Sequence, residues 1–139
     1  MKLRQPTDRL ANCVWLARLV DKARLYQSGE LGEDYARVFC HPLATDGQFL
    51  EHFQLKKEEI LAVIDGSPTN DEELTEWFIN CPQITSALIE EWNTLAPNLG
   101  KKGYPMQRGF QWALKNFYAD KETSAGVDSI FTAIEFDEK

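Results

Sequence analysis

Short apolar segments with helical spacing, each bounded by its own start and stop signals, constrain the fold of this 139-residue chain most. Apolar residues recur every three or four positions, which is the pattern of a helix with one buried face. Proline, glycine and N-cap residues separate the segments. We predict six or seven short helices: from Pro6-Thr7-Asp8 to Ser28, over 45–53, 55–66, 71–80 and 85–96, and near 106–118 and 127–134.

These helices predict an all-α, or mainly α, fold in a single globular domain over 1–139, a usual length for one domain. The stretch EDYARVFCHP (33–42) is the exception, because it is rich in β-branched and aromatic residues and ends at a proline. We predict an extended connector there, able to pair as a short strand.

The N-terminus and the cysteines indicate in which cellular compartment the protein works. MKLRQPTDRL has no apolar core behind its charges, so it does not resemble a secretory signal. The longest apolar stretch, CVWLA, is far too short to span a membrane. Cys13, Cys40 and Cys81 are odd in number and widely spaced, as is usual for reduced thiols. We therefore expect a cytoplasmic protein.

The net charge of −7 is distributed unevenly. Residues 1–57 carry nine Lys and Arg against seven Asp and Glu, whereas 58–100 carry nine acidic residues and no basic one. An acidic middle repels phosphate backbones, so nucleic acid is an unfavoured partner. Alternatively, the basic first helix faces the acidic middle, and the opposite charges neutralise each other within the molecule.

The first predicted helix carries the candidate site, formed by Arg18, Asp21, Lys22 and Arg24 in an otherwise apolar surround. Asp21 lies three residues from each arginine and could bridge both, which would make the cluster a structural ion network. Alternatively, Arg18 and Lys22 are like charges at i, i+4, and a bound carboxylate or phosphate would relieve their repulsion. Both readings remain open from the sequence.

Cys40-His41 places a thiol beside an imidazole, although sequence neighbours seldom face each other as nucleophile and base. We include both residues in the candidate ligand-binding set and assign no catalytic residue. The chain has only two histidines, His41 and His52, and lacks CxxC and HExxH spacings. We therefore expect no metal and no cofactor.

Several motifs together resemble an uncharacterised bacterial family, domain of unknown function family 5069 (DUF5069). The resemblance is strongest over 15–78. It rests on Arg4 and Pro6, Asp21 to Arg24, Gly29 with Leu31-Gly32-Glu33, Pro42-Leu43, Phe49-Leu50, Trp77, Trp92-Asn93 and Phe136-Asp137. The family cysteine directly precedes the proline, whereas here His41 stands there and Cys40 lies one position earlier. The resemblance implies a bacterial, cytoplasmic, helical domain and no activity.

Two functions from different classes follow from these residues. The first is a non-enzymatic binding or interaction module that holds an anionic small molecule or a partner's carboxylate at the first helix. The second is a small enzyme acting on an anionic substrate, with Asp21, Glu33 or His41 as its acid or base. A deep pocket at the cluster would favour a small ligand, and a flat apolar patch would favour a protein partner.

Overall fold

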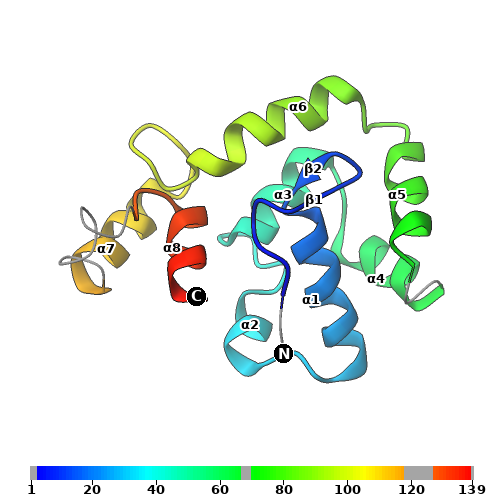
Figure 1. Ribbon diagram of the computed structural model, residues 1–139, viewed down its shortest axis with the longest axis horizontal. Helices are drawn as coiled ribbons and strands as arrows, with labels where there is room; N and C mark the ends of the chain where they lie inside the picture. The colour runs from blue at the N-terminus through cyan, green and yellow to red at the C-terminus, as the bar shows by residue number, and fades with distance from the viewer. Residues whose placement is uncertain (1–2, 67–69, 118–126, 139) are drawn as a thin grey trace. The chain divides into compact units, whose positions relative to one another are not determined.

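The computed structural model describes residues 3–66, 70–117 and 127–138. These residues form eight α-helices, a 3-10 helix and one two-stranded antiparallel sheet (Figure 1), which confirms the mainly α fold. The elements are β1 (Arg9–Leu10), β2 (Cys13–Val14), α1 (Leu16–Ser28), α2 (Glu33–Val38), α3 (Thr45–Phe53), α4 (Lys57–Gly66), α5 (Asp71–Asn80), α6 (Ser86–Leu95), η1 (Ala96–Asn98), α7 (Gln107–Phe117) and α8 (Ile130–Asp137).

The chain divides into two compact units, Met1–Trp92 and Asn93–Lys139. The single domain expected over 1–139 stays a prediction. The second unit has an apolar cluster in which α7 and α8 meet Val127, which precedes α8 in the chain. Its buried members are Phe110, Leu114, Val127 and Ala133, with Ile130 and Phe136 packed against them.

The first unit is built on α1 and an aromatic cluster. α1 buries Leu16, Leu19 and Val20 completely, as its nearly unbroken apolar sequence predicts. The aromatic cluster gathers rings from α3, α5 and α6. Its fully buried members are Phe49, Phe53, Phe78 and Trp92, with neighbouring ring centroids 4.7 to 6.1 Å apart.

The first helix begins later than predicted. Residues 9–14 form a tight hairpin in which Leu10 pairs with Cys13, and α1 begins only at Leu16. Ala11 and Asn12 both have positive φ, as a two-residue hairpin turn requires. Trp15 also has a left-handed backbone, with φ of 72°, which separates the hairpin from α1. The prediction of a helix from Thr7-Asp8 was therefore wrong, because Leu10, Cys13 and Val14 suit either element.

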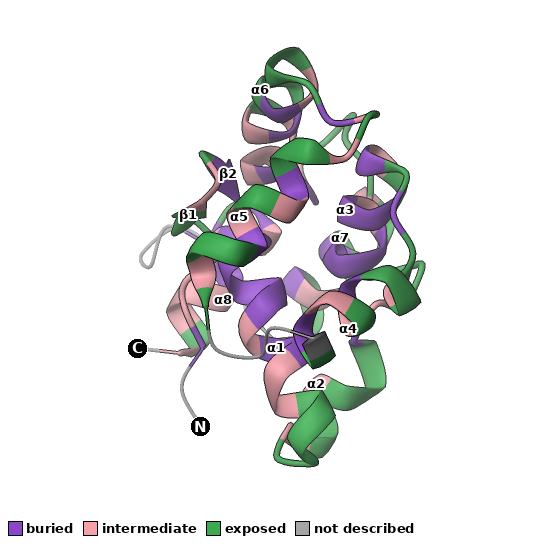
Figure 2. Cartoon of the chain, turned by 90° about the vertical axis from the view of Figure 1, so that its right-hand side faces the viewer, coloured by how far each residue is buried: buried purple, intermediate pink, exposed green. Residues whose placement is uncertain are grey.

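The extended connector predicted over 33–42 is also wrong. Residues 33–38 form α2, which brings the number of α-helices in the described ranges to eight. Glu33 and Asp34 lie in its first turn, where the helix dipole favours negative charge. Arg37 pairs with both carboxylates at 3.6 and 3.8 Å. None of the residues of α2 is buried (Figure 2), so local charge pairing outweighs β-propensity here.

Most of the other predicted boundaries are confirmed. Gly29 ends α1 with φ of 77°. The sequence Thr69-Asn70-Asp71-Glu72 matches a capping box. The Asn70 side chain caps α5 by accepting from the backbone N–H groups of Glu72 and Glu73, while Thr69 lies outside the described residues. In the parts of the chain that are described, no helix has both the length and the apolar character that crossing a bilayer requires.

Gly47, in the first turn of α3, allows the preceding loop to pass very close to the helix. A Cβ added at Gly47 would lie 2.6 Å from the Pro42 Cα and even closer to the His41 carbonyl oxygen. Both of these are backbone atoms, which cannot rotate away as a flexible side chain would. The loop over residues 40–44 is thereby held against α3.

We expect Gly47→Ala to lower the free energy of unfolding by about 1–3 kcal/mol, the usual effect of forcing extra volume into a packed site. Urea unfolding measures this. Gly109→Ala in α7 is the control, because nothing lies within 4 Å of its added Cβ. It should raise the free energy by up to about 1 kcal/mol through helix propensity. Equal effects of the two substitutions would contradict the close approach at Gly47.

Candidate functional site

Lys22 forms a buried ion pair with Asp46, which lies in the first turn of α3. The Lys22 Nζ donates to both carboxylate oxygens of Asp46, at 2.7 and 2.8 Å. The side chains are 4% and 0% exposed. Trp15 Nε1 and the Cys40 backbone N–H donate to the same carboxylate at 2.8 and 3.0 Å. Asp46 therefore accepts four hydrogen bonds, and Lys22 is committed to it.

This arrangement weighs against binding of an external anion by Lys22, which stays a prediction. A buried ammonium that already has a buried carboxylate partner would have to lose that partner before binding another. Its Nζ also lies 4.9 Å from the centroid of the Trp15 ring, an additional cation–π contact. Lys22 is a structural residue.

Arg18 is also buried, with 2% of its surface exposed. Its guanidinium carbon lies 5.5 Å from the centroid of the Trp15 ring and 5.9 Å from that of Tyr35. Its Nη1 donates to the carbonyl oxygen of Arg4 at 3.1 Å. Cation–π contacts with two rings together with a donated hydrogen bond are typical of a positioned arginine.

Asp21 does not bridge Arg18 and Arg24 as the helical spacing suggested. Its hydrogen bonds within the described residues come from Arg4: from the backbone N at 2.8 Å, from Nε at 3.1 and 3.2 Å, and from Nη2 at 2.9 Å. A guanidinium that arrives from another segment can align its planar fork with a carboxylate. Arginines on the same helix cannot do this as easily from i±3 positions.

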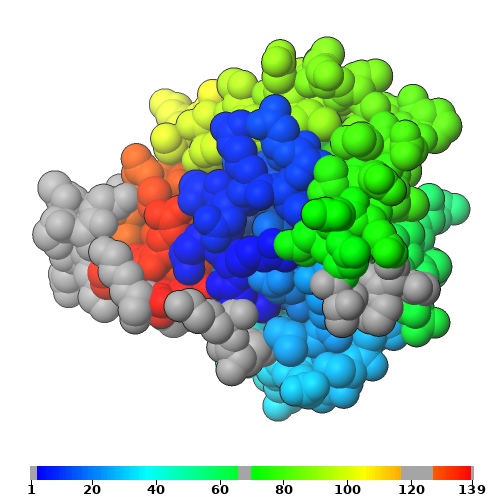
Figure 3. All heavy atoms as spheres, turned by 45° about the vertical axis from the view of Figure 1, so that its right-hand side comes forward, coloured from blue at the N-terminus to red at the C-terminus, as the bar shows by residue number. Residues whose placement is uncertain are grey.

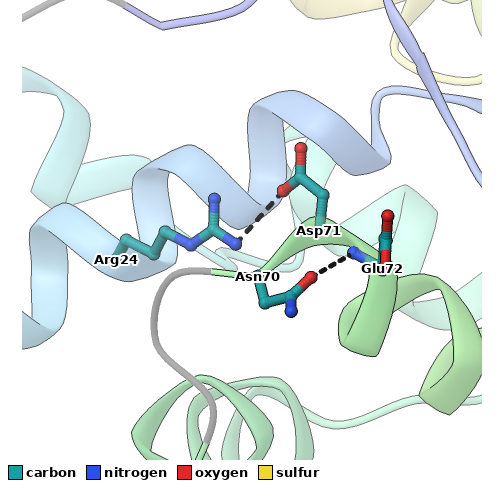
Figure 4. A pocket seen from close by; sticks show the side chains of 4 residues that line it. All are labelled: Arg24, Asn70, Asp71 and Glu72. Atoms are coloured by element: carbon teal, nitrogen blue, oxygen red, sulfur yellow. Dashed lines mark hydrogen bonds and ion pairs between the residues drawn. The ribbon is translucent and has the colours of Figure 1, made fainter.

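Arg24 instead pairs with Asp71, at the start of α5, with 3.1 Å between Nη2 and Oδ1. Asp71 also accepts from Arg4 Nη1 at 2.8 Å. The hydrogen bond from Arg4, assisted by Arg24, holds the pKa of Asp71 below its ordinary value. Arg24 and Asp71, with Asn70 and Glu72, line an open hollow of about 500 Å³ (Figure 4). The basic first helix thus faces part of the acidic middle.

Cys40 and His41 are not brought together as a reactive pair. Burial raises the pKa of the Cys40 thiol to about 12, and the negative charge of Asp46 contributes to this. The His41 side chain is exposed, and its Nδ1 accepts from the Leu43 backbone N–H at 3.0 Å. Cys40 joins the buried cluster only through its backbone N–H.

The alternative acid or base Glu33 lies on exposed α2 and pairs with Arg37. Asp21, Glu33 and His41 therefore each have a different local partner. Among residues 3–66, 70–117 and 127–138, no three His, Cys, Asp or Glu side chains are grouped as metal ligands would be.

Three charged residues that complete the site escaped prediction: Arg4, Asp46 and Asp71. Arg4 and Asp71 are far from α1 in sequence, and no local pattern connects them to it. One signal pointed toward Asp46, since two cations in an apolar helix face require a buried anion from elsewhere in the fold. No signal identified which of the acidic residues would supply it.

The family comparison agrees with the motifs that these residues form. The family model described as "Domain of unknown function (DUF5069)" matches residues 1–139. The chain belongs to the DUF5069 family. No curated protein and no solved structure matches the chain. The DUF5069 match extends beyond 15–78, where the motifs are densest, to the whole chain.

We expect Lys22→Met to lower the free energy of unfolding by about 3–5 kcal/mol, because it leaves the Asp46 carboxylate buried without its counter-charge. Urea unfolding monitored by tryptophan fluorescence measures the change. Arg37→Met is the matched control, because Arg37 belongs to exposed pairs and should alter stability by less than about 1 kcal/mol. A gain in stability for Lys22→Met would contradict the structural role of the pair.

We expect iodoacetamide at pH 8 to label Cys40 at least about a hundredfold more slowly than a free-thiol peptide, because only the thiolate reacts. The high pKa of Cys40 leaves very little thiolate at that pH. Peptide mapping by mass spectrometry distinguishes Cys40 from Cys13 and Cys81 in the native chain. Labelling as fast as that of the free peptide would restore Cys40 as a reactive thiol.

Proposed function

We propose that this protein is a non-enzymatic binding module that holds a carboxylate of a protein partner or of an anionic small molecule at the open edge of α1. Arg24 is the residue that takes the carboxylate. The observation that carries the proposal is its position, since Arg24 lines the open hollow and its counter-ion Asp71 is 42% exposed (Figure 4).

The guanidinium of Arg24 has hydrogen-bonding capacity to spare. Its Nε and Nη2 make no hydrogen bond within the described part of the chain, and Nη2 lies 3.1 Å from Asp71 Oδ1 as an ion pair. Both nitrogens are buried, so an external carboxylate reaches them only when the guanidinium turns outward into the hollow. A carboxylate can accept two parallel bonds from an arginine fork. Exposed ion pairs contribute at most about 1 kcal/mol, so an external carboxylate can compete with Asp71.

Negative charge around the hollow determines what Arg24 can bind. Asp71 and Glu72 line it as well, and both repel a free anion. A partner must therefore add contacts outside the hollow, as a protein surface does. Because the hollow is open, it favours a protein side chain over an enclosed small molecule.

Non-enzymatic binding is favoured because the available acid, base and thiol groups have other roles. Asp21 accepts from Arg4, and the raised pKa of Cys40 keeps it a thiol. The three cysteines are free thiols, which supports the proposal that the protein works in the bacterial cytoplasm. The family resemblance supports the same proposal.

The test is titration of the ¹⁵N-labelled chain with N-acetylglutamate amide, whose only charge is one carboxylate. We expect the Arg24 Nε–H resonance to shift on binding, and Arg24→Met to abolish binding. Asp71→Asn should bind the probe about three- to tenfold more tightly, since it removes the competing carboxylate. Arg37→Met, which removes an arginine from α2, should bind as the wild type does. Undiminished binding by Arg24→Met would exclude Arg24 as the site.

A further inference from the structure

The N-terminal segment Leu3–Asp8 lies against α1 and reaches the start of α5 (Figure 3). Two of its apolar residues are buried: Leu3, with 4% exposed, and Pro6. The Pro6 carbonyl oxygen accepts from the Trp15 backbone N–H at 3.0 Å. We call residues 3–8 the strap.

Arg4 makes the polar contacts of the strap with its main chain as well as its side chain. Its backbone N–H donates to Asp21, and its carbonyl oxygen accepts from Arg18 Nη1. Its guanidinium binds Asp21 through Nε and Nη2, and Asp71 through Nη1 at 2.8 Å and Nη2 at 3.4 Å. Three side chains thus contact the N–H, the C=O and the guanidinium of one arginine residue.

This set of contacts is more specific than a surface ion pair. An ion pair contacts only the charged end of a side chain and is satisfied by lysine as well as arginine. Here two carboxylates surround a planar fork, which requires arginine. The main-chain contacts with Asp21 and Arg18 require, in addition, that the arginine belong to a peptide.

The neighbours of Arg4 extend the pattern along the strap. The buried Leu3 precedes Arg4, and the buried Pro6 follows two positions later, while Gln5 lies between them. A residue before proline is restricted to extended backbone, which suits a segment lying along a surface. The occupied sequence is therefore Leu-Arg-x-Pro, and its last two residues enter a turn in which the Asp8 backbone N–H donates to the Gln5 carbonyl oxygen at 3.0 Å.

We propose that Arg18, Asp21 and Asp71 form a recognition site for a Leu-Arg-x-Pro segment of another polypeptide, and that the strap is its occupant within the chain. The segment binds when the strap lifts. Its arginine then takes the contacts of Arg4, with its guanidinium between Asp21 and Asp71 and its carbonyl on Arg18. This site differs from the carboxylate site at Arg24 in ligand charge, so the two proposals can fail separately.

The strap competes strongly because it is tethered to the site. A tethered ligand acts at a high effective concentration, so an added peptide binds the wild type more weakly than it would bind an open site. Arg4→Ala removes the guanidinium contacts of the competitor with Asp21 and Asp71 and leaves the three recognising side chains intact. The variant therefore weakens the strap and frees both carboxylates for an added arginine.

The experiment uses the peptide acetyl-Leu-Arg-Gln-Pro-amide and the full-length chain, with calorimetric titration and thermal midpoints as readouts. We expect the peptide to bind Arg4→Ala at least about tenfold more tightly than it binds the wild type, and to raise the midpoint of the variant. The matched peptide with citrulline in place of arginine should not bind. The Arg4→Ala/Asp21→Asn double variant should lose the response.

If Arg4→Ala does not fold, Arg4→Lys replaces it, because lysine keeps the charge but cannot form the fork. The peptide should again bind this variant more tightly than the wild type. The proposal is overturned if neither variant binds the arginine peptide more tightly than the wild type does. It is also overturned if the citrulline peptide binds equally well.

Sedimentation velocity of the wild type then identifies the source of the segment. A dimer that Arg4→Ala abolishes indicates exchange of straps between two copies of this chain. A monomer whose Arg4→Ala variant binds the peptide indicates that a different polypeptide supplies the segment.

Discussion

The buried carboxylate of Asp46 is the interaction on which the arrangement of the first unit depends. It accepts from Lys22 on α1, from the Trp15 indole before α1, and from the Cys40 backbone after α2. Trp15 and Lys22 lie 31 and 24 residues before Asp46 in sequence and Cys40 lies six residues before it, so one charge connects several segments. Trp15 and Cys40 both have positive φ, at 72° and 58°. Such backbone is unfavourable for residues with side chains and persists only where surrounding contacts hold it.

The ion pair of Asp46 divides the charges of α1 into an inner set and an outer set. The inner set, Lys22 with Asp46, is removed from solvent and stabilises the packing. The outer set, Asp21 and Arg24, meets the strap and the start of α5 at the surface. Exchange with a partner is open to the outer set, because its pairs retain solvent contact. The buried Arg18 takes part only through its hydrogen bond to the main chain of the strap. Both functional proposals therefore concern this edge.

Arg4 and Arg24 share Asp71, which links the two proposed sites physically. Asp71 is the counter-ion of Arg24 in the open hollow and one of the carboxylates that hold Arg4. Occupation of one site therefore alters the charge balance at the other. A partner carboxylate that binds Arg24 displaces Asp71 from Arg24 and leaves Asp71 paired with Arg4. When the strap lifts, Asp71 stays paired with Arg24 alone. Such coupling between neighbouring sites is a consequence of sharing one carboxylate.

The sequence by itself determined most of the helices, because their start and stop signals are local: the Asn70 cap, the Gly29 stop and the prolines between segments. It also identified α1 as the buried, chemically unusual helix. Local signals misled at residues 9–14 and 33–38, where the apolar spacing and β-propensity suit more than one element. Only the tertiary structure decided which carboxylate meets which cation. Asp46, Asp71 and Arg4 reach α1 from distant segments, and pairing between distant charges depends on the path of the folded chain, which no local pattern encodes.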